Sequence, residues 1–130
     1  MKLDDVFGVH EEAVRLRARR SEVLASNMAN ADTPGYKARD FDFGAMLRKE
    51  MQPPVRLAAT HAGHIRSDPG IVASTQMAYR IPQQPSLDGN TVEVEREQSE
   101  FSENAMRYQA SLRFLDGRIK GLLRAIKGNG

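Results

Sequence analysis

Residues 24–43 of this chain read LASNMANADTPGYKARDFDF, and this stretch decides the fold because it joins the end of a helix to a tight turn. Asn27 and Asn30 lie one helical turn apart among alanines. Small side chains let another backbone approach closely, and amides can pair there with groups that would otherwise be buried without a partner. Pro34 and Gly35 supply the fixed φ and the positive φ of a type II turn. We predict an assembly contact at the asparagine pair, in preference to a plain surface turn.

Upstream of this turn, from Leu3 to about Ala31, the apolar residues recur at helical spacing. They form two overlapping stripes, one of Val6, Val9, Ala13, Leu16 and Val23 and one of Leu3, Phe7, Val14, Leu24 and Met28. Two stripes indicate two neighbours for this helix. The alternative is one broad stripe against a single core, which the sequence leaves open.

The C-terminal segment carries a sustained heptad pattern, in which alternating steps of four and three run from residue 94 to residue 126. A continuous helix of this length measures about 50 Å at roughly 1.5 Å per residue, so it must pack along something equally long. The predicted helix seam consists of Val94, Phe101, Ala105, Tyr108, Leu112, Leu115, Ile119, Leu122 and Ile126.

Four polar or small residues mark the start and the interior of this second helix. Asn90 has the side chain of an N-cap, and Glu93 follows three residues later, as in a capping box. Gly117 and Gly121 lie inside the helix, where each costs about 1 kcal/mol relative to alanine. Their spacing indicates close approach by another backbone, and a helix that frays or bends there is the alternative.

Both terminal helices begin with acids and continue with bases. The N-terminal set is Asp4, Asp5, Glu11 and Glu12 followed by Arg15, Arg17, Arg19 and Arg20; the C-terminal set is Glu93, Glu95, Glu97, Glu100 and Glu103 followed by Arg113, Arg118, Lys120, Arg124 and Lys127. Antiparallel pairing places the acids of one helix beside the bases of the other, whereas parallel pairing opposes like charges. The helix macrodipole favours the same pattern on each helix alone. We predict an antiparallel pair.

The middle of the chain differs from both ends in composition and periodicity. A short helix is predicted through Phe43, Met46, Leu47 and Met51, ending before two prolines. Residues 55–90 are rich in glycine, proline and aspartate without a lasting period, which indicates extended chain, turns and at most one short hairpin. The chain is therefore expected to be one elongated, mainly α domain. It divides into a helix at 1–32, a turn, short helix and extended segment at 33–90, and a heptad helix at 91–130.

Composition limits the function classes. With 130 residues, 40% hydrophobic and 6% aromatic, the apolar content is thin for an isolated globule and ample for helices that bury seams against neighbours. There is no cysteine, so disulfides and thiolate metal sites are excluded. The N-terminus has acids where a secretory signal has its apolar core, so export would need a route without a cleaved signal peptide.

The sequence contains no arrangement of residues typical of a catalytic, metal or phosphate-binding site. His61 and His64 are spaced i, i+3 and His10 is remote, which is too little for a metal site. The arginines at 15–20 spread around most of a helix, and a net charge of +2 does not favour nucleic acid. We find no phosphate-cradling loop and no nucleophile elbow. We therefore predict no catalytic residues, no cofactor, no metal, no nucleic-acid partner and no small-molecule substrate.

The run Ala-Ser-Asn-Met-Ala-Asn-Ala-Asp-Thr-Pro-Gly-Tyr-Lys-Ala, residues 25–38, resembles the N-terminal signature of the bacterial flagellar axial proteins, the family of rod and hook subunits. Within that family, the segments 39–43 and 85–92 are similar to the proximal rod subunits. The resemblance covers residues 15–43 and 79–126, with the middle unmatched. It implies a structural, non-enzymatic protein whose terminal helices lie in a coiled-coil layer and polymerise into the proximal rod of the basal body. The implied assembly motif is Asn27, Asn30, Ala31, Asp32, Thr33, Pro34, Gly35 and Tyr36.

The resemblance also implies partners and a location. The partners are other copies of the chain, other rod proteins, the membrane-ring and rod-adaptor proteins at the rod base, and the type III export apparatus. The location is the rod of the flagellar basal body in the periplasmic space.

Two other classes stay open from the sequence. A soluble coiled-coil adaptor or export chaperone would form a small helical oligomer in solution, whereas a rod subunit would be monomeric and would order its ends on assembly. Circular dichroism and light scattering separate these two. A cell-wall-remodelling enzyme would turn over peptidoglycan.

Overall fold

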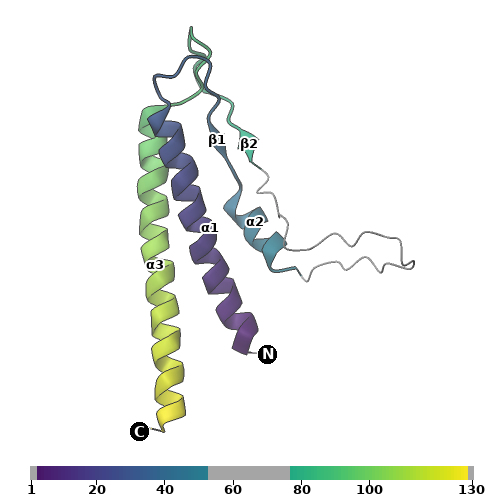
Figure 1. Ribbon diagram of the computed structural model, residues 1–130, viewed down its shortest axis with the longest axis vertical. Helices are drawn as coiled ribbons and strands as arrows, with labels where there is room; N and C mark the ends of the chain where they lie inside the picture. The colour runs from purple at the N-terminus through teal and green to yellow at the C-terminus, as the bar shows by residue number, and fades with distance from the viewer. Residues whose placement is uncertain (1–2, 53–76, 129–130) are drawn as a thin grey trace, which may run out of the picture.

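The computed structural model describes residues 3–52 and 77–128, with side chains from residue 7 onward. Two long helices dominate it (Figure 1): α1 spans Leu3–Ala29 and α3 spans Val94–Lys127. At one end of the helix pair, the segments 30–38 and 80–93 form a cap that we call the apex. The predictions for His61, His64 and the prolines at 53–54 fall outside the described residues.

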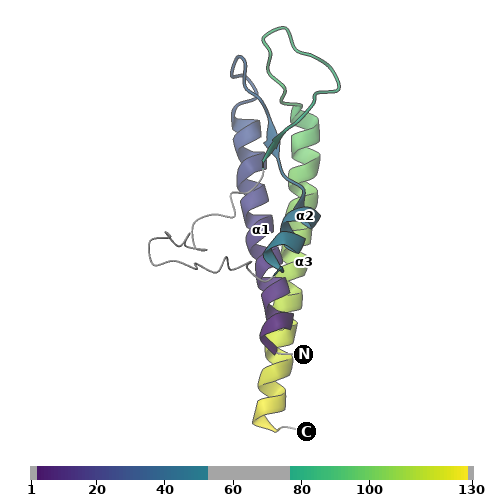
Figure 2. The same ribbon diagram turned by 90° about the vertical axis from the view of Figure 1, so that its right-hand side faces the viewer.

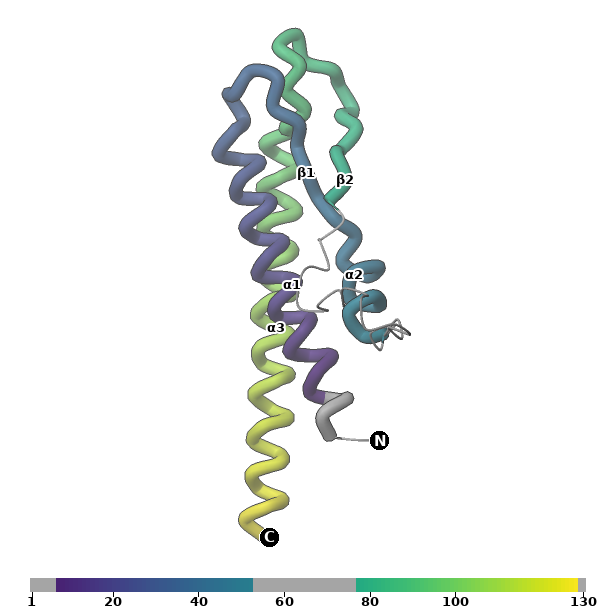
Figure 3. The backbone as a smooth tube through the Cα atoms, turned by 45° about the vertical axis from the view of Figure 1, so that its right-hand side comes forward, coloured from purple at the N-terminus to yellow at the C-terminus, as the bar shows by residue number. Residues whose placement is uncertain are grey.

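The two helices pack side by side and run antiparallel, as predicted (Figures 1 and 3). The rings of His10 and Phe114 lie 4.4 Å apart at one level, and Arg20 Nη2 pairs with Glu100 Oε2 at 2.8 Å at another. The second contact joins the basic part of α1 to the acidic part of α3, as the charge pattern predicted. Glu12 instead pairs along its own helix, and in the described side chains no ion pair joins residues 7–12 to residues 113–127.

α1 has a second neighbour in the short helix α2, Phe43–Glu50, which packs against α1 on the side away from α3 (Figure 1) and stands in front of the helix pair in the turned view (Figure 2). Asp42 caps it, because its Oδ1 accepts from the Ala45 N–H at 3.0 Å. The hydrophobic core forms between α1 and α2, and consists of Leu16, Phe41 and Met46 with Val23, Phe43 and Leu47 packed against them. The two-neighbour interpretation of the α1 stripes is therefore confirmed within the chain itself.

Two short strands connect α2 to the apex. β1, Arg39–Asp40, pairs antiparallel with β2, Ala78–Tyr79, and the register places Arg39 opposite Tyr79 (Figure 3). The Arg80 N–H extends the ladder by donating to Ala38 O at 2.9 Å. The sequence analysis expected at most one short hairpin, with both strands within residues 55–90. In the structure β2 lies in that range, but its partner β1 lies before α2, after the turn that follows α1. Alternation of polar and apolar residues cannot predict this strand pairing, because a strand of two residues is too short to show alternation.

The structure divides the predicted α3 seam between two faces. Phe101, Tyr108, Leu115 and Leu122 are half-buried, and two polar residues of the same helix, Glu97 and Asn104, make side-chain contacts with α1. Asn104 is fully buried and its Nδ2 donates to Arg17 O and Ser21 Oγ, both at 2.8 Å. The remaining seam positions Val94, Leu112, Ile119 and Ile126 are exposed, and Ala105 is half-buried. The contact with α1 therefore leaves Leu112, Ile119 and Ile126 uncovered, and we call these three residues the open half of the seam.

Candidate functional site

The apex brings the two segments with the flagellar resemblance into direct contact. The Gly35 N–H donates to Asp88 O at 2.9 Å, and the Thr91 N–H donates to Tyr36 O at 3.0 Å. The Ala38 N–H donates to Thr91 Oγ1 at 2.8 Å. Each of these bonds pairs groups more than fifty residues apart in the chain. The helix exit and the segment before α3 therefore stabilise one another.

The predicted turn is present at residues 33–36. The Tyr36 N–H donates to Thr33 O at 3.2 Å, and Gly35 has φ 72°. A positive φ at the third residue of the turn is the requirement of type II, and only glycine adopts it without strain. The turn is confirmed, with Asp32, Thr33, Pro34 and Gly35 exposed at its surface.

Asn90 holds the turn that follows α1. Its Nδ2 lies 3.0 Å from Asn30 O, 2.9 Å from Ala31 O and 2.8 Å from Thr33 O, and the residue is buried. All three carbonyls lie after Ala29, the last residue of α1. One side-chain amide therefore contacts the carbonyls of this turn and holds the turn to the segment before α3.

The predicted capping box at α3 is wrong. The residue at the N-cap is Glu93, whose side chain makes no cap hydrogen bond; its Oε1 accepts from the Gln83 N–H at 2.6 Å. Asn90 Oδ1 accepts from the Val92 N–H at 2.7 Å, which forms a local turn before the helix. The amide of Asn90 instead binds carbonyls of the turn after α1, a long-range contact that local sequence spacing does not reveal.

Replacing Asn90 with alanine is expected to lower the free energy of unfolding by about 1–3 kcal/mol, because several carbonyls at a buried position lose their donor. Urea denaturation followed by circular dichroism measures this loss. Gln84→Ala, which removes an exposed amide from the same loop, is the matched control and should change stability by less than about 0.5 kcal/mol. Equal stabilities of the two variants would contradict the role of Asn90 in holding the turn after α1.

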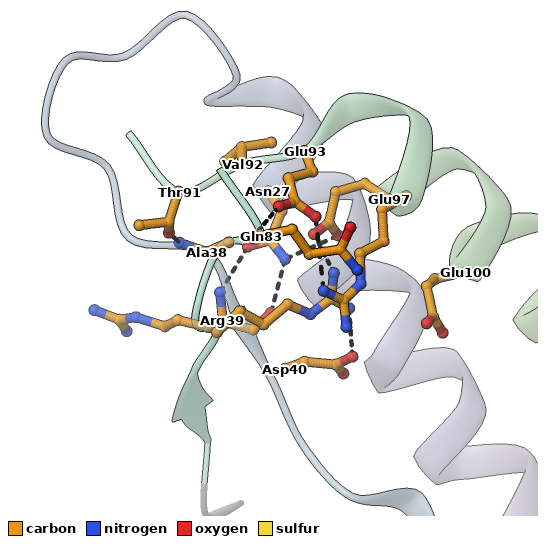
Figure 4. A network of polar contacts seen from close by, with 12 residues as sticks. Asn27, Ala38, Arg39, Asp40, Gln83, Thr91, Val92, Glu93, Glu97 and Glu100 are labelled. Carbon is orange, nitrogen blue, oxygen red and sulfur yellow. Dashed lines mark hydrogen bonds and ion pairs between the residues drawn. The ribbon is translucent and has the colours of Figure 1, made fainter. Parts of the chain in front are cut away.

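Asn27 is fully buried, and its carboxamide binds the backbone of β1 as a neighbouring strand would (Figure 4). Its Nδ2 donates to Arg39 O at 2.7 Å, and its Oδ1 accepts from the Arg39 N–H at 3.1 Å. Nδ2 also donates to Glu97 Oε2 at 3.1 Å, and Oδ1 accepts from the Tyr36 hydroxyl at 3.4 Å. All four hydrogen-bonding positions of the amide are therefore used within the chain.

A network of charged side chains continues from Asn27 across four segments of the chain (Figure 4). Arg80 pairs with Glu97 and, at 2.5 Å, with Asp40. Arg20 binds Asp40 in bidentate fashion at 3.1 and 2.9 Å, and reaches Glu100 at 2.8 Å. The side chain of Glu97 is 1% exposed, so its charge depends on these partners. The network fixes α1, β1, the end of β2 and α3 relative to one another.

The environment shifts the pKa values of the two central carboxyls in opposite directions. Burial raises the pKa of Glu97, and the hydrogen bond from Asn27 opposes this only in part. Burial also acts to raise the pKa of Asp40, but the hydrogen bonds from Arg20 and Arg80 outweigh it and hold that pKa below its usual value. Arg20 in turn has a raised pKa, chiefly because it binds Asp40. Asp40 is therefore the carboxylate that the two arginines stabilise most.

Asp40→Asn is expected to lose about 2 kcal/mol of stability at pH 7, since charge-assisted hydrogen bonds to two arginines are weakened. A carboxyl with a depressed pKa contributes stability above its unfolded pKa, near 3.8, and loses it as pH falls through the lower folded value. The stability difference between wild type and Asp40→Asn should therefore be constant above about pH 5 and shrink below about pH 4. Urea titrations across this range test it; a constant difference at all pH values would contradict it.

Sequence reasoning placed the assembly motif at the helix exit, and the structure locates Asn27 in the last turn of α1 and the other members in the apex. Asn30 follows the last residue of α1 and caps that end of the helix, because its Nδ2 donates to Ser26 O at 2.8 Å. Sequence reasoning missed Arg80, Asp40 and Asn104 altogether. Arg80 lies in a segment without periodicity, so the sequence offered no reason to place it near α3. The one indication was the run of acids at the start of α3, which would attract a basic partner.

In the described part of the chain, no three metal-ligating side chains come together. Across those same residues, no helix has the length and apolar character needed to cross a membrane. Backbone hydrogen bonds join the two segments of the apex, and buried ion pairs fix it to the helices, so these contacts serve to hold the chain together.

Comparison with known proteins agrees with this picture. Residues 7–37 match the family model described as flagella basal body rod protein. The chain is 47% identical over 132 residues to the flagellar basal body rod protein FlgB of Escherichia coli K12, covering 97% of this chain and 96% of the relative. It is 52% identical over 124 residues to FlgB of Cereibacter sphaeroides, with 95% of each chain covered, and 46% identical over 130 residues to FlgB of Aeromonas hydrophila, with 98% and 97% covered.

Proposed function

Because this chain belongs to the FlgB family of flagellar basal body rod proteins, as a structural subunit of that rod, we propose that it polymerises into the proximal rod through the open half of its α3 seam. The identity to the relative from Escherichia coli K12 extends over 96% of that protein, which supports the same role for the whole of this chain.

The observation that carries this proposal is the exposed apolar row on α3. Leu112, Ile119 and Ile126 follow one another at intervals of seven and are 39%, 44% and 73% exposed. Positions seven apart lie on one side of a helix in a supercoil, so they form a continuous stripe that α1 does not cover. Apolar rows of this kind are stabilised by a further helix alongside.

We infer that the neighbours on this stripe are other copies of the chain and other rod proteins. Membrane-ring and rod-adaptor proteins would contact it at the base of the rod, and the flagellar export apparatus would deliver it to the rod within the periplasmic space. The role is structural rather than catalytic, with Asn27, Asn30 and the turn at 33–36 shaping the end of the subunit that meets its neighbours.

The test is to delete the gene for this chain in its own bacterium and to restore it with a tagged copy. Deletion should abolish motility, and isolated basal bodies should lack the rod. The tagged copy should restore both and be recovered in the isolated basal bodies. Normal rods without the chain would refute the proposal.

Gly121 supplies a second test, because no neighbouring atom in the described chain lies within 4 Å of the place where its Cβ would be. Gly121→Ala should stabilise the isolated chain by about 1 kcal/mol through helix propensity. If another backbone packs there in the rod, the same change should reduce motility. Thermal unfolding and swimming assays measure the two effects, and unimpaired swimming would contradict close approach at this glycine.

A further inference from the structure

The hydrogen bonds between the side chains of α3 and α1 involve one row of α3. Asn104 Nδ2 donates to Arg17 O and Ser21 Oγ, both at 2.8 Å. Asn27 Nδ2 donates to Glu97 Oε2 at 3.1 Å. Glu97 and Asn104 are 1% and 0% exposed and stand seven residues apart, so they lie on one line along a helix in a supercoil. We call this line the polar row.

Two further contacts with α1 lie beside the polar row. Arg20 pairs with Glu100, and the ring of His10 lies 4.4 Å from the ring of Phe114. Glu100 and Phe114 stand fourteen residues apart, two heptads, so they share a row of their own. These contacts place α1 over the polar row and its outer neighbour.

The position of α1 differs from the one that the heptad pattern favours. At about 3.5 residues per turn, successive rows around α3 are about 50° apart. Their order is the row of Glu100 and Phe114, the polar row, the row of Phe101 and Tyr108, and the row of Leu112. The predicted seam consists of the last two rows, yet Leu112 is 39% exposed. Burial of apolar side chains alone therefore does not explain how α3 is rotated about its axis.

We propose that Asn104 is a positioning residue, which sets the rotation of α3 against α1 and so leaves the open half of the seam uncovered. An amide buried at 0% exposure needs partners, and Arg17 O and Ser21 Oγ supply them only while the polar row faces α1. A turn of α3 by one row would bring Leu112 under α1 and would break both hydrogen bonds. Glu97 holds the same orientation at the apex end of the helix.

Asn104 fixes this orientation at a cost in stability. Its Oδ1 is buried and has no hydrogen-bond partner in the part of the chain that the structure describes. A polar residue at the interface of two helices selects one pairing among several apolar ones at such a cost. The inference rests on the proposed function, because the row that Asn104 leaves uncovered is the proposed assembly surface.

The absence of cysteine allows a direct test of the rotation, since a single thiol at position 112 reports whether its row is covered. The full-length chain with Leu112→Cys is alkylated with iodoacetamide, with and without a change at Asn104. Asn104→Asp keeps the shape of the side chain but replaces its donor by an acceptor that repels Arg17 O. Asn104→Ala removes the amide. Each change should lower the alkylation rate at least about threefold, because the thiol moves under α1.

The direction of the effect separates rotation from loss of stability. Partial unfolding would expose the thiol and raise the rate, whereas rotation lowers it. Ser102→Asp, at an exposed position of α3, is the matched control for the added charge and should change the rate by less than about twofold. Circular dichroism checks that each variant keeps its helices, and Asn104→Ala decides if the aspartate variant does not fold.

The second readout is assembly. Asn104→Ala should lower the amount of chain recovered in isolated basal bodies at least about tenfold. A rate at position 112 that is unchanged or raised by Asn104→Ala would overturn the positioning role, and full recovery of a chain with the lowered rate would overturn its link to assembly. Absence of the wild-type chain from basal bodies would instead refute the proposed function and leave the measured rotation standing.

Discussion

Glu97→Leu is expected to lower the free energy of unfolding by about 3–5 kcal/mol, because it removes the central anion of a buried network. Arg80 would keep Asp40 as its partner but lose Glu97, and the Asn27 amide would lose an acceptor at a fully buried position. A loss of this size is a large fraction of the stability of a small domain. Urea denaturation at pH 7 measures it.

Two variants separate charge from packing at this position. Glu97→Gln keeps an oxygen acceptor for Asn27 and the size of the side chain, so its loss should be smaller, about 1–3 kcal/mol. Glu103→Leu lies on the same helix at an exposed ion pair, and should cost less than about 1 kcal/mol. If Glu97→Leu were no worse than Glu103→Leu, the network would not hold the apex together.

Ile119→Asp is expected to abolish motility while leaving the isolated chain folded. Ile119 is 44% exposed in the free chain, so aspartate there costs less than about 1 kcal/mol of stability. In a rod where another helix covers the open half of the seam, the same carboxylate would be buried without a partner, which costs several kcal/mol per contact. Swimming assays, together with circular dichroism of the purified chain, measure the two effects.

Leu115→Asp gives the contrast, because Leu115 is half-buried on the side of α3 that faces α1. This change should destabilise the isolated chain as well as block assembly. Gln109→Asp, at an exposed polar position of α3, controls for the added charge. Motile cells that assemble rods with Ile119→Asp would show that the open half of the seam is not an assembly surface.

The amino-acid sequence alone determined the helices of this protein and the relative direction of the two long ones. Helical spacing in α1 and the heptad of α3 set two long helices, and the order of acids and bases set their antiparallel pairing, with Arg20 and Glu100 in contact as a result. The type II turn followed from Pro34 and Gly35, because proline and glycine restrict φ locally. These properties depend on residues close together in the chain or on patterns repeated over many turns.

Only the tertiary structure decided which partners the single polar residues take. Asn90 binds the turn after α1 instead of capping α3, Asn27 pairs with the backbone of β1, and Arg80 joins Asp40 to Glu97. Each is one side chain that meets groups from 12 to more than 50 residues away, and no periodic pattern marks such a contact in advance. The division of the α3 heptad has the same origin, since the sequence carries the full stripe and only packing against α1 shows which half stays open.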